Sequence, residues 1–271
     1  QIHFYKILKE SRKRREEKVL KDLENKKIKA DSVLVVKILP SGERKFIVKK
    51  NIHKRHQIAS LTKLMTALVV FDHYKLNSKI TISKEAIAQE GDAGKLKPRE
   101  KLRTKDLLYP MLIESSNDAA YALAEKIGLD KFVYLMNLEA KKIGLRETHY
   151  SDPTGEDDGN FSTAYDLVSL AFYILNYRPE IFDISKIKEK ELMTPCPREP
   201  IHLCPHHYMK NTNHLLWEIP WVIGSKTGWT PEAKGCLIMV LKKDTDKFIN
   251  VVIGSDDRFA DMKKLIYYYN K

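Results

Sequence analysis

The order of hydrophobic patterns along the 271 residues constrains the fold more than any other feature of the sequence. Strand-like runs occur near both ends, whereas apolar residues recur at helical spacing from Ser60 to about Arg178. The predicted strands cover residues 32–39 and 44–48, with a turn at 40–43, and then residues 221–223, 237–241 and 248–253. Strands from the two ends need a common sheet to bury their apolar faces. The pattern therefore predicts an α+β fold, in which an antiparallel sheet is flanked by helices and carries an inserted helical subdomain.

Helices are predicted wherever apolar residues return every third or fourth position. The first begins at Ser60, and its stripe includes Leu61, Leu64 and Leu68. Others are expected over residues 107–112, 119–127, 132–143, 167–175 and 259–269. Gly144 should end the fourth of these six, and Ser162 or Thr163 should cap the fifth. Residues 188–207 are rich in Pro, His and Cys, and we expect a loop there.

The net charge of +12 is concentrated at the N-terminus. Residues 1–29 contain eleven Lys or Arg and five Asp or Glu, which is half of the positive excess. We divide the chain into a basic N-terminal arm, residues 1–29, and a main domain, residues 30–271. The arm is either a solvated, partly helical leader or a segment that lies on an anionic membrane or cell-wall surface. Nucleic-acid binding is not expected, because aromatic residues are not interleaved with the basic run and no reading module follows.

The composition is that of a globular protein, with 43% hydrophobic and 31% charged residues. No apolar run reaches 18 residues, so no membrane span is predicted. The first residue is Gln1 rather than Met, and a removed signal peptide or anchor is compatible with that start. Cys196 and Cys204 lie close together in the sequence and could form a disulfide in an oxidising compartment. Cys236 is expected to be a buried strand residue.

Two clusters invite a metal interpretation, and neither fits a known pattern. His202, His206 and His207 lie close to the cysteine pair, but their spacing matches no standard zinc site. The run Asp157-Asp158-Gly159 lacks the alternating acids and the distal glutamate of a calcium loop, so a solvated acidic loop is favoured. We expect neither a metal nor a cofactor.

Ser60-Leu61-Thr62-Lys63 is the first of three motifs that suggest nucleophilic catalysis. A serine hydroxyl attacks well only when a neighbouring group takes its proton. Ser60 and Lys63 would share a helix face, and the helix start favours developing negative charge at the serine. A buried Lys63 could then act as the base. The alternative interpretation of Ser60 is an ordinary N-cap.

The second and third motifs are Ser115-Ser116-Asn117 and Lys226-Thr227-Gly228. The second precedes a predicted helix, so Asn117 is either its cap or a group that binds Lys63 and the substrate backbone. In the functional interpretation, Ser115 lies against Lys63 and relays a proton. Lys226 and Thr227 offer a cation and a hydroxyl to a carboxylate, and Gly228 permits close approach of a backbone. The alternative for the third motif is an edge strand that turns at Gly228.

With these motifs the chain resembles the low-molecular-mass penicillin-binding proteins, which are bacterial D-alanyl-D-alanine carboxypeptidases and endopeptidases. The resemblance covers about residues 30 to 269. It includes the stretches IASLTKLMTALVV, ESSNDAAYALAEKIG, FVYLMNLEAKKIGLRETHYSDPTG, STAYDLVSLA, KNTNHLL, GSKTGWTPEAKGCLIMV and RFADMKKLI. It implies a β-lactamase/DD-peptidase-like fold, peptidoglycan peptides as substrates and β-lactam antibiotics as ligands. It also implies a location on the periplasmic or wall-facing side of the membrane.

The resemblance assigns catalytic roles to four side chains. Ser60 would be the acylated nucleophile and Lys63 its general base, while Ser115 and Asn117 would serve in the second motif. The backbone N–H groups of Ser60 and Trp229 would form the oxyanion hole.

Substrate binding is assigned to the third motif and to one residue beyond it. Lys226 and Thr227 would hold the terminal carboxylate beside Gly228. Arg258, five residues before Lys263, matches an arginine that assists in some members of the family.

The sequence departs from many carboxypeptidases of the family in two respects. Ile58 stands where many of them have proline. The chain also stops one short helix after the last predicted strand, whereas many members continue into a β-rich domain and a membrane anchor. Together with the KNTNHLL and SDPTG stretches, this makes the chain most similar to the small DD-endopeptidases.

Two alternatives from other functional classes were weighed. A class A-type β-lactamase shares the fold and the motifs, but it needs a glutamate in an E-x-x-L-N pattern that residues 150–155 lack. A non-catalytic penicillin-sensing or wall-binding module would have lost Ser60, Lys63 or Lys226, and all three are present.

Overall fold

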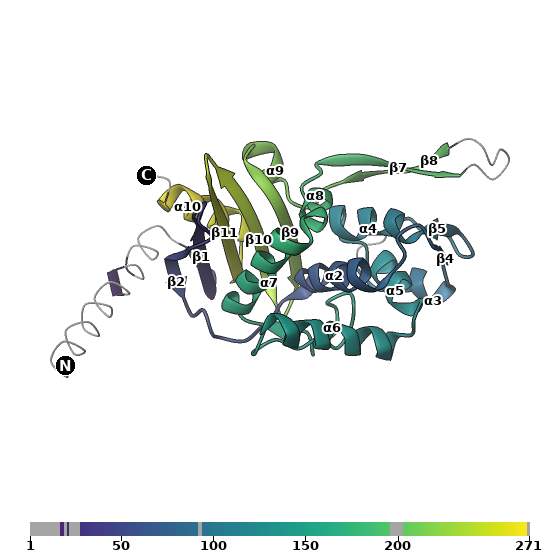
Figure 1. The fold of residues 1–271 in the computed structure, drawn as a ribbon, viewed down its shortest axis with the longest axis horizontal. Helices are drawn as coiled ribbons and strands as arrows, with labels where there is room; N and C mark the ends of the chain where they lie inside the picture. Colours follow the sequence, from purple (N-terminus) through teal and green to yellow (C-terminus); the bar gives the residue numbers. More distant parts are fainter. Residues whose placement is uncertain (1–16, 19–20, 22–27, 92–93, 196–202, 270–271) are drawn as a thin grey trace.

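A five-stranded antiparallel sheet forms the frame of the molecule (Figure 1). The structure is a computed structural model, and it describes residues 17–18, 21, 28–91, 94–195 and 203–269. The sheet has the order β2-β1-β11-β10-β9. Its strands are β1 (Ser32–Ile38), β2 (Arg44–Lys50), β9 (Val222–Thr230), β10 (Lys234–Lys243) and β11 (Asp246–Ser255). Strand β1 pairs with β11 from Ser32 opposite Ile253 to Ile38 opposite Lys247. Strands from both ends of the chain therefore share one sheet, as predicted.

Successive residues of β1 point to opposite faces of this sheet, and a separate core covers each face. Leu34 and Val36 belong to the larger core, which includes helix α7 (Ala164–Tyr177). Val33 and Val35 belong to the smaller core, which includes helix α10 (Arg258–Tyr269). Helices therefore cover both faces of the sheet, α7 on the side of the larger core and α10 on the side of the smaller core.

The region between the N- and C-terminal strands is mainly helical, and most of it lies beside the β9 edge of the sheet, whereas α7 covers one face (Figure 1). Its helices are α2 (Lys63–His73), α3 (Lys84–Ile87), α4 (Thr104–Ile113), α5 (Asn117–Glu125), α6 (Leu129–Ile143), α7, α8 (Pro179–Ser185) and α9 (Leu215–Glu218). Short strands pair as β3 (His56–Gln57) with β6 (Phe161–Ser162), and as β4 (Lys79–Thr81) with β5 (Lys101–Arg103). The α+β class with an inserted helical region is confirmed.

The predicted helix ends agree with the structure at α6 and α7. Gly144 follows α6 with a positive φ of 83°, a conformation that glycine adopts without strain. Thr163 caps α7 by accepting a hydrogen bond from the Asp166 N–H group. The start of α2 differs from the prediction, because residues Ala59–Thr62 form a 3₁₀ turn and the α-helix begins at Lys63.

The loop predicted over residues 188–207 is wrong where the structure describes it. Strands β7 (Glu189–Pro195) and β8 (Leu203–Lys210) form a hairpin that extends beyond the helices (Figure 1). Leu192 and Met209 are buried with Ile113 of α4, so the hairpin is held by an apolar contact. Pro205 lies where the strand register shifts, a position at which strands accept proline. The prolines concealed the alternating pattern.

Cys204, His206 and His207 of this hairpin have partners other than a metal. Cys204 is disulfide-bonded, and its predicted partner Cys196 lies outside the described residues, as does His202. His206 Nε2 and His207 Nε2 contact the carboxylates of Glu100 and Glu114 at 2.9 and 2.8 Å. Within the described ranges no group of three or more His, Cys, Asp or Glu side chains is arranged to hold a metal ion.

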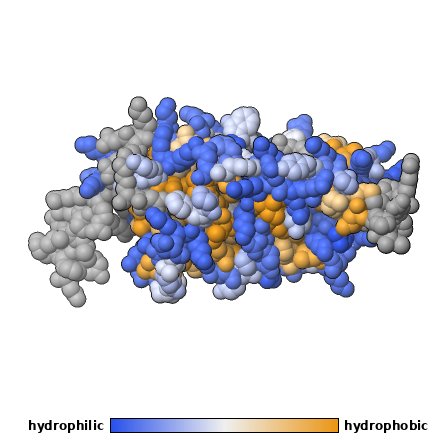
Figure 2. All heavy atoms as spheres, turned by 90° about the horizontal axis from the view of Figure 1, so that it is seen from above, coloured by the Kyte–Doolittle hydropathy of each residue, from blue (hydrophilic) through white to orange (hydrophobic). Residues whose placement is uncertain are grey.

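The end of the predicted basic arm contacts the main domain. Ile28 is buried in the smaller core, and the backbone N–H groups of Lys29 and Ala30 donate to the Asp261 carboxylate. Most of the arm lies outside the described residues, so its surface-binding role stays a prediction. Hydrophilic residues cover much of the face in Figure 2, with hydrophobic patches between them. No helix among the described residues has both the length and the apolar character needed to cross a membrane.

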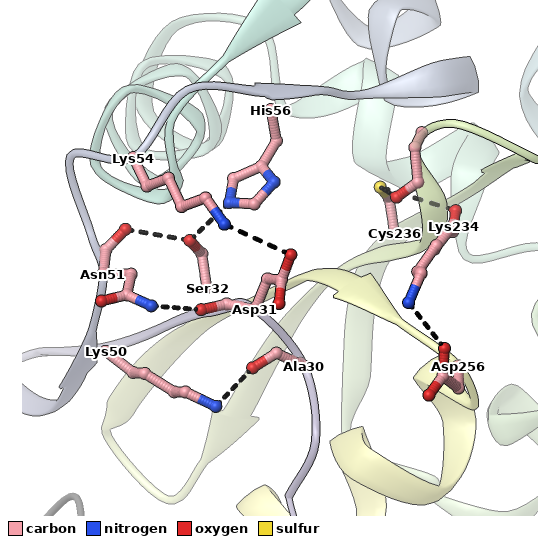
Figure 3. Close-up of polar contacts among 11 residues, drawn as sticks. Ala30, Asp31, Ser32, Lys50, Asn51, Lys54, His56, Lys234, Cys236 and Asp256 are labelled. Atoms are coloured by element: carbon pink, nitrogen blue, oxygen red, sulfur yellow. Dashed lines mark hydrogen bonds and ion pairs between the residues drawn. The ribbon is translucent and has the colours of Figure 1, made fainter.

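The segment that leads to Ser60 is fixed to the start of β1 (Figure 3). The Ser32 hydroxyl lies 2.8 Å from His56 Nε2 and donates to the Asn51 carbonyl. Asn51 Nδ2 donates in turn to the Asp31 carbonyl at 2.8 Å. Burial is the main cause that lowers the pKa of His56, and Lys54 lowers it further. These contacts position β3 and, two residues later, the turn that carries Ser60.

Candidate active site

Ser60 lies in the 3₁₀ turn between β3 and α2, and this turn is enclosed by two glycines. A Cβ atom on Gly155 would lie 2.1 Å from the Ala59 carbonyl oxygen and 3.0 Å from the Ser60 nitrogen. A Cβ atom on Gly228 would lie 3.0 Å from the same nitrogen. Larger residues at either position would displace the turn, so the absence of side chains there sets the position of the Ser60 backbone.

Lys63 is fully buried at the first position of α2, and its ammonium group contacts three elements. Lys63 Nζ donates to Ser60 Oγ at 2.7 Å, to Asn117 Oδ1 at 2.6 Å and to the Thr154 carbonyl at 2.7 Å. The predicted pairing of serine and lysine is therefore present in the geometry. A base 2.7 Å from a hydroxyl oxygen is within the range needed for direct proton transfer.

The three consecutive residues of the second motif, Ser115-Ser116-Asn117, each make different contacts. Ser116, rather than Asn117, caps α5, because its hydroxyl accepts from the Ala119 N–H group at 3.0 Å. Of the two alternatives for Asn117, the cap is therefore wrong, and the contact with Lys63 is present: its side chain accepts from Lys63 and donates through Nδ2 to Glu156 Oε1 at 2.8 Å. Ser115 has a φ of 67°, which is unusual for a residue with a side chain and is found at functional turns.

The third motif lies on β9 at the edge of the sheet. The Lys226 side chain is buried and donates to Ser115 Oγ at 2.8 Å, so it joins the second motif to the sheet. The Thr227 hydroxyl lies 2.6 Å from that of Thr212. The strand continues through Gly228 to Thr230, and the alternative of a turn at Gly228 is therefore wrong.

A cavity of about 340 Å³ opens over these groups. The predicted residues in its wall are Ser60, Ser115, Thr227, Gly228, Trp229 and Arg258. The other three predicted residues are buried, and each is hydrogen-bonded to a residue of this wall. Lys63 donates to Ser60, Asn117 donates to Glu156, and Lys226 donates to Ser115. A larger hollow of about 780 Å³ lies near Arg44 and Tyr165, but it contains none of the three motifs. The chemistry therefore belongs to the smaller cavity.

Sequence reasoning missed three contributors to this site. The Thr154 carbonyl binds Lys63, Thr212 contacts Thr227, and the Glu156 carboxylate lines the cavity and binds Asn117. Thr154 and Thr212 belong to the SDPTG and KNTNHLL stretches, whose similarity to the family was a usable signal. No pattern in the sequence distinguished Glu156 from the acidic residues that follow it.

Arg258 lies at the first position of α10, with its guanidinium 4.6 Å from the centre of the Phe259 ring. A Cβ atom on Gly235 would lie 3.0 Å from Arg258 Cβ, so the arginine packs closely on β10. Gly235 is opposite Trp229 in the sheet. Arg258 therefore lines the cavity beyond the third motif, as expected for a group that assists the carboxylate site.

Comparison with known protein families agrees with this arrangement. The model of the D-alanyl-D-alanine carboxypeptidase family, peptidase S11, matches residues 19–257. The chain belongs to this family. The D-alanyl-D-alanine carboxypeptidase family thus accounts for the order of the three motifs and for the fold that brings them together.

Individual relatives of the family give the same result. The D-alanyl-D-alanine carboxypeptidase DacF of Bacillus subtilis is 34% identical, with 82% of this chain and 58% of the relative covered. A D-alanyl-D-alanine endopeptidase of Escherichia coli is 33% identical, with 77% and 67% covered. Among solved structures, a Streptomyces K15 DD-transpeptidase variant has a TM-score of 0.78 at 30% identity, with 88% and 97% covered. The match spans less than two thirds of the length of DacF but nearly all of the Streptomyces protein.

Proposed function

We propose that the protein is a serine D-alanyl-D-alanine peptidase that acts on peptidoglycan stem peptides and binds β-lactams. The observation that carries this proposal is the contact of Lys63 Nζ with both Ser60 Oγ and Asn117 Oδ1 at the base of an open cavity. A serine with a buried amine at hydrogen-bond distance is the arrangement that Ser-Lys acyl transfer requires.

In the acylation step, Ser60 Oγ attacks the carbonyl carbon of a D-Ala-D-Xaa bond while Lys63, in its neutral form, accepts the hydroxyl proton. The backbone N–H groups of Ser60 and Trp229 stabilise the oxyanion that develops. The C–N bond then breaks, and the proton held by Lys63 passes through the Ser115 hydroxyl to the leaving amine, which returns Lys63 to its neutral form. Support for this relay comes from the 2.8 Å hydrogen bond that Ser115 Oγ accepts from Lys226.

In the deacylation step, water attacks the ester carbonyl while neutral Lys63 takes a proton from the water. The C–O bond to Ser60 then breaks, and Lys63 returns the proton to Ser60 Oγ as the shortened peptide leaves. The terminal carboxylate of the substrate is bound by Thr227 and Arg258, and the positive charge of Lys226 behind Thr227 favours that anion. A β-lactam would form the same ester bond, but its opened ring remains attached and blocks the leaving-group side.

Wall peptides lie outside the cytoplasm, and we propose that the protein acts there. The basic residues 1–29 would place it on an anionic membrane or wall surface, an attraction that salt weakens.

The test is an assay of peptide products from two substrates, a monomeric pentapeptide and a cross-linked dimer. Wild type should cleave at least one of them, and Ser60→Ala should cleave neither while retaining the wild-type melting temperature. Release of D-alanine from the monomer alone would define a carboxypeptidase. The endopeptidase activity suggested by the sequence similarity would then be wrong. Equal cleavage by wild type and Ser60→Ala would refute the proposal.

A further inference from the structure

Glu156 is an exposed carboxylate in the wall of the catalytic cavity. Its Oε1 atom accepts a hydrogen bond from Asn117 Nδ2 at 2.8 Å, which aims the group at the centre of the site. Among the residues that the structure describes, no Lys, Arg or His side chain forms an ion pair with it. An anion in a site that is proposed to bind a peptide carboxylate would repel that carboxylate, so Glu156 must face a different part of the substrate.

The two charged groups of the cavity wall lie on separate segments of the chain. Glu156 follows Gly155, which packs against the Ala59 carbonyl on one side of the turn. Arg258 packs against Gly235 on β10, beyond the Gly228 side of the same turn. The cavity wall therefore has its anion beside Gly155, which packs on the Ser60 turn, and its cation beside Gly235 of β10.

This polarity fixes the direction of a bound peptide. If the terminal carboxylate lies at Thr227 and Arg258, the acyl part of the peptide extends across Ser60 toward Glu156. We propose that Glu156 binds an ammonium group on the acyl side of the substrate, namely the free side-chain amine of a diamino acid that precedes the D-alanine. The inference rests on the proposed function and specifies which stem peptides the site prefers.

The free amine of a diamino acid is lost when that residue is cross-linked through its side chain. Glu156 would therefore distinguish two kinds of acyl donor. In one the side-chain amine of the diamino acid is free, and in the other a cross-link has converted that amine into an amide. The group acts as a specificity-determining residue, because it does not take part in the bonds that form or break.

The test compares kcat/KM for two peptides ending in Lys-D-Ala-D-Ala, one with a free ε-amine and one with an Nε-acetyl group. Wild type should prefer the free amine by about five-fold, the effect of one ion pair in water. The difference should appear mainly in KM, because the contact exists before and during the reaction. It should decrease as NaCl is raised from 0.05 to 1 M.

The Glu156→Gln variant separates charge from positioning, because the glutamine oxygen can still accept from Asn117 Nδ2. It should lose the preference, and it should still be acylated by penicillin at Ser60, which shows that the nucleophile is intact. Glu156→Lys should reverse the preference. Asp158→Asn is the matched control: Asp158 is an exposed acid two residues away that accepts from Gln57 Nε2 at 3.0 Å, and it should leave the preference intact.

Each outcome separates this inference from the function on which it rests. Wild type that is acylated at Ser60 but shows no preference overturns the inference alone, as does a Glu156→Gln variant that keeps the preference. Wild type that is not acylated at Ser60 by penicillin and cleaves neither peptide overturns the proposed function, and the inference with it.

Discussion

Gly155→Ala perturbs the nucleophile without altering any group that takes part in the chemistry. The added Cβ atom would lie 2.1 Å from the Ala59 carbonyl oxygen and 2.4 Å from the Ala59 carbonyl carbon. Non-bonded carbon atoms prefer separations of about 3.5–4.0 Å, so the overlap is about 1 Å. Both obstructing atoms belong to the backbone, and therefore either the Ser60 turn or the Gly155 loop must move.

A displacement of this size reaches the base as well as the nucleophile. The Gly155 loop carries the Thr154 carbonyl, which accepts from Lys63 Nζ at 2.7 Å. A shift of about 1 Å would lengthen that hydrogen bond beyond the normal limit of about 3.2 Å. Misplacement by about 1 Å costs on the order of 100-fold in rate, which is the loss of acylation rate that we expect.

Stability should fall as well. An alanine at the φ of +91° found at Gly155 costs about 1–2 kcal/mol, and relief of the overlap costs about 1–3 kcal/mol. The sum of about 2–5 kcal/mol corresponds to a decrease in Tm of about 10 °C for a domain of this size.

Gly42→Ala is the matched control for backbone strain. Gly42 has a φ of +84°, but no atom lies within 4 Å of the position of its Cβ. The free energy of unfolding of this control should fall only by the cost of the backbone conformation, about 1–2 kcal/mol, and the control should be acylated at the wild-type rate. The assays are stopped-flow acylation by a chromogenic penicillin and thermal unfolding. A folded Gly155→Ala variant that acylates as fast as Gly42→Ala would refute this account of how Ser60 is positioned.

Three further predictions concern single side chains. Burial raises the pKa of the Cys236 thiol to about 12, so this cysteine should resist a thiol reagent at pH 8 until the protein is unfolded, as measured by mass spectrometry; rapid labelling of the native protein would contradict it. His56 has a pKa below its ordinary 6.5 in the folded state, so its contribution to stability is complete above pH 6.5 and is lost as the pH falls through the lowered value. The free energy of unfolding of His56→Gln should accordingly depend less on pH below 6.5, and an unchanged slope in urea titrations would count against this assignment. Ser116→Ala should lower stability by about 1 kcal/mol through loss of the α5 cap, whereas an unchanged urea midpoint would mean that the hydroxyl contributes nothing.

The sheet and most helices could be predicted because burial imposes a period on the sequence. The strands near residues 32–38 and 248–253 alternate or run apolar, and both proved to be neighbours in one sheet. The hairpin over residues 189–210 was missed because its buried positions are few and prolines interrupt its pattern. The start of α2 was predicted three residues too early. The helical pattern of apolar residues begins at Ser60, but residues Ala59–Thr62 form a 3₁₀ turn and the α-helix begins at Lys63.

The candidate site was predicted where short motifs place reactive side chains, and missed where the backbone or a distant contact acts. The pairing of Ser60 with Lys63 follows from a spacing of three residues. The Thr154 carbonyl has no side-chain signature, because every residue carries a carbonyl group, and only the similarity of the SDPTG stretch to the family pointed to it. Glu156 could not be assigned either, since only the fold brings its carboxylate to Asn117.

Mass analysis of the protein after exposure to penicillin tests the central claim most directly. The account predicts one added penicilloyl group, located by proteolysis on the peptide that contains Ser60, and no added mass on a folded Ser60→Ala variant. A stable adduct on another residue, or an unmodified wild-type protein of native stability, would contradict the claim that Ser60 is an acylated nucleophile.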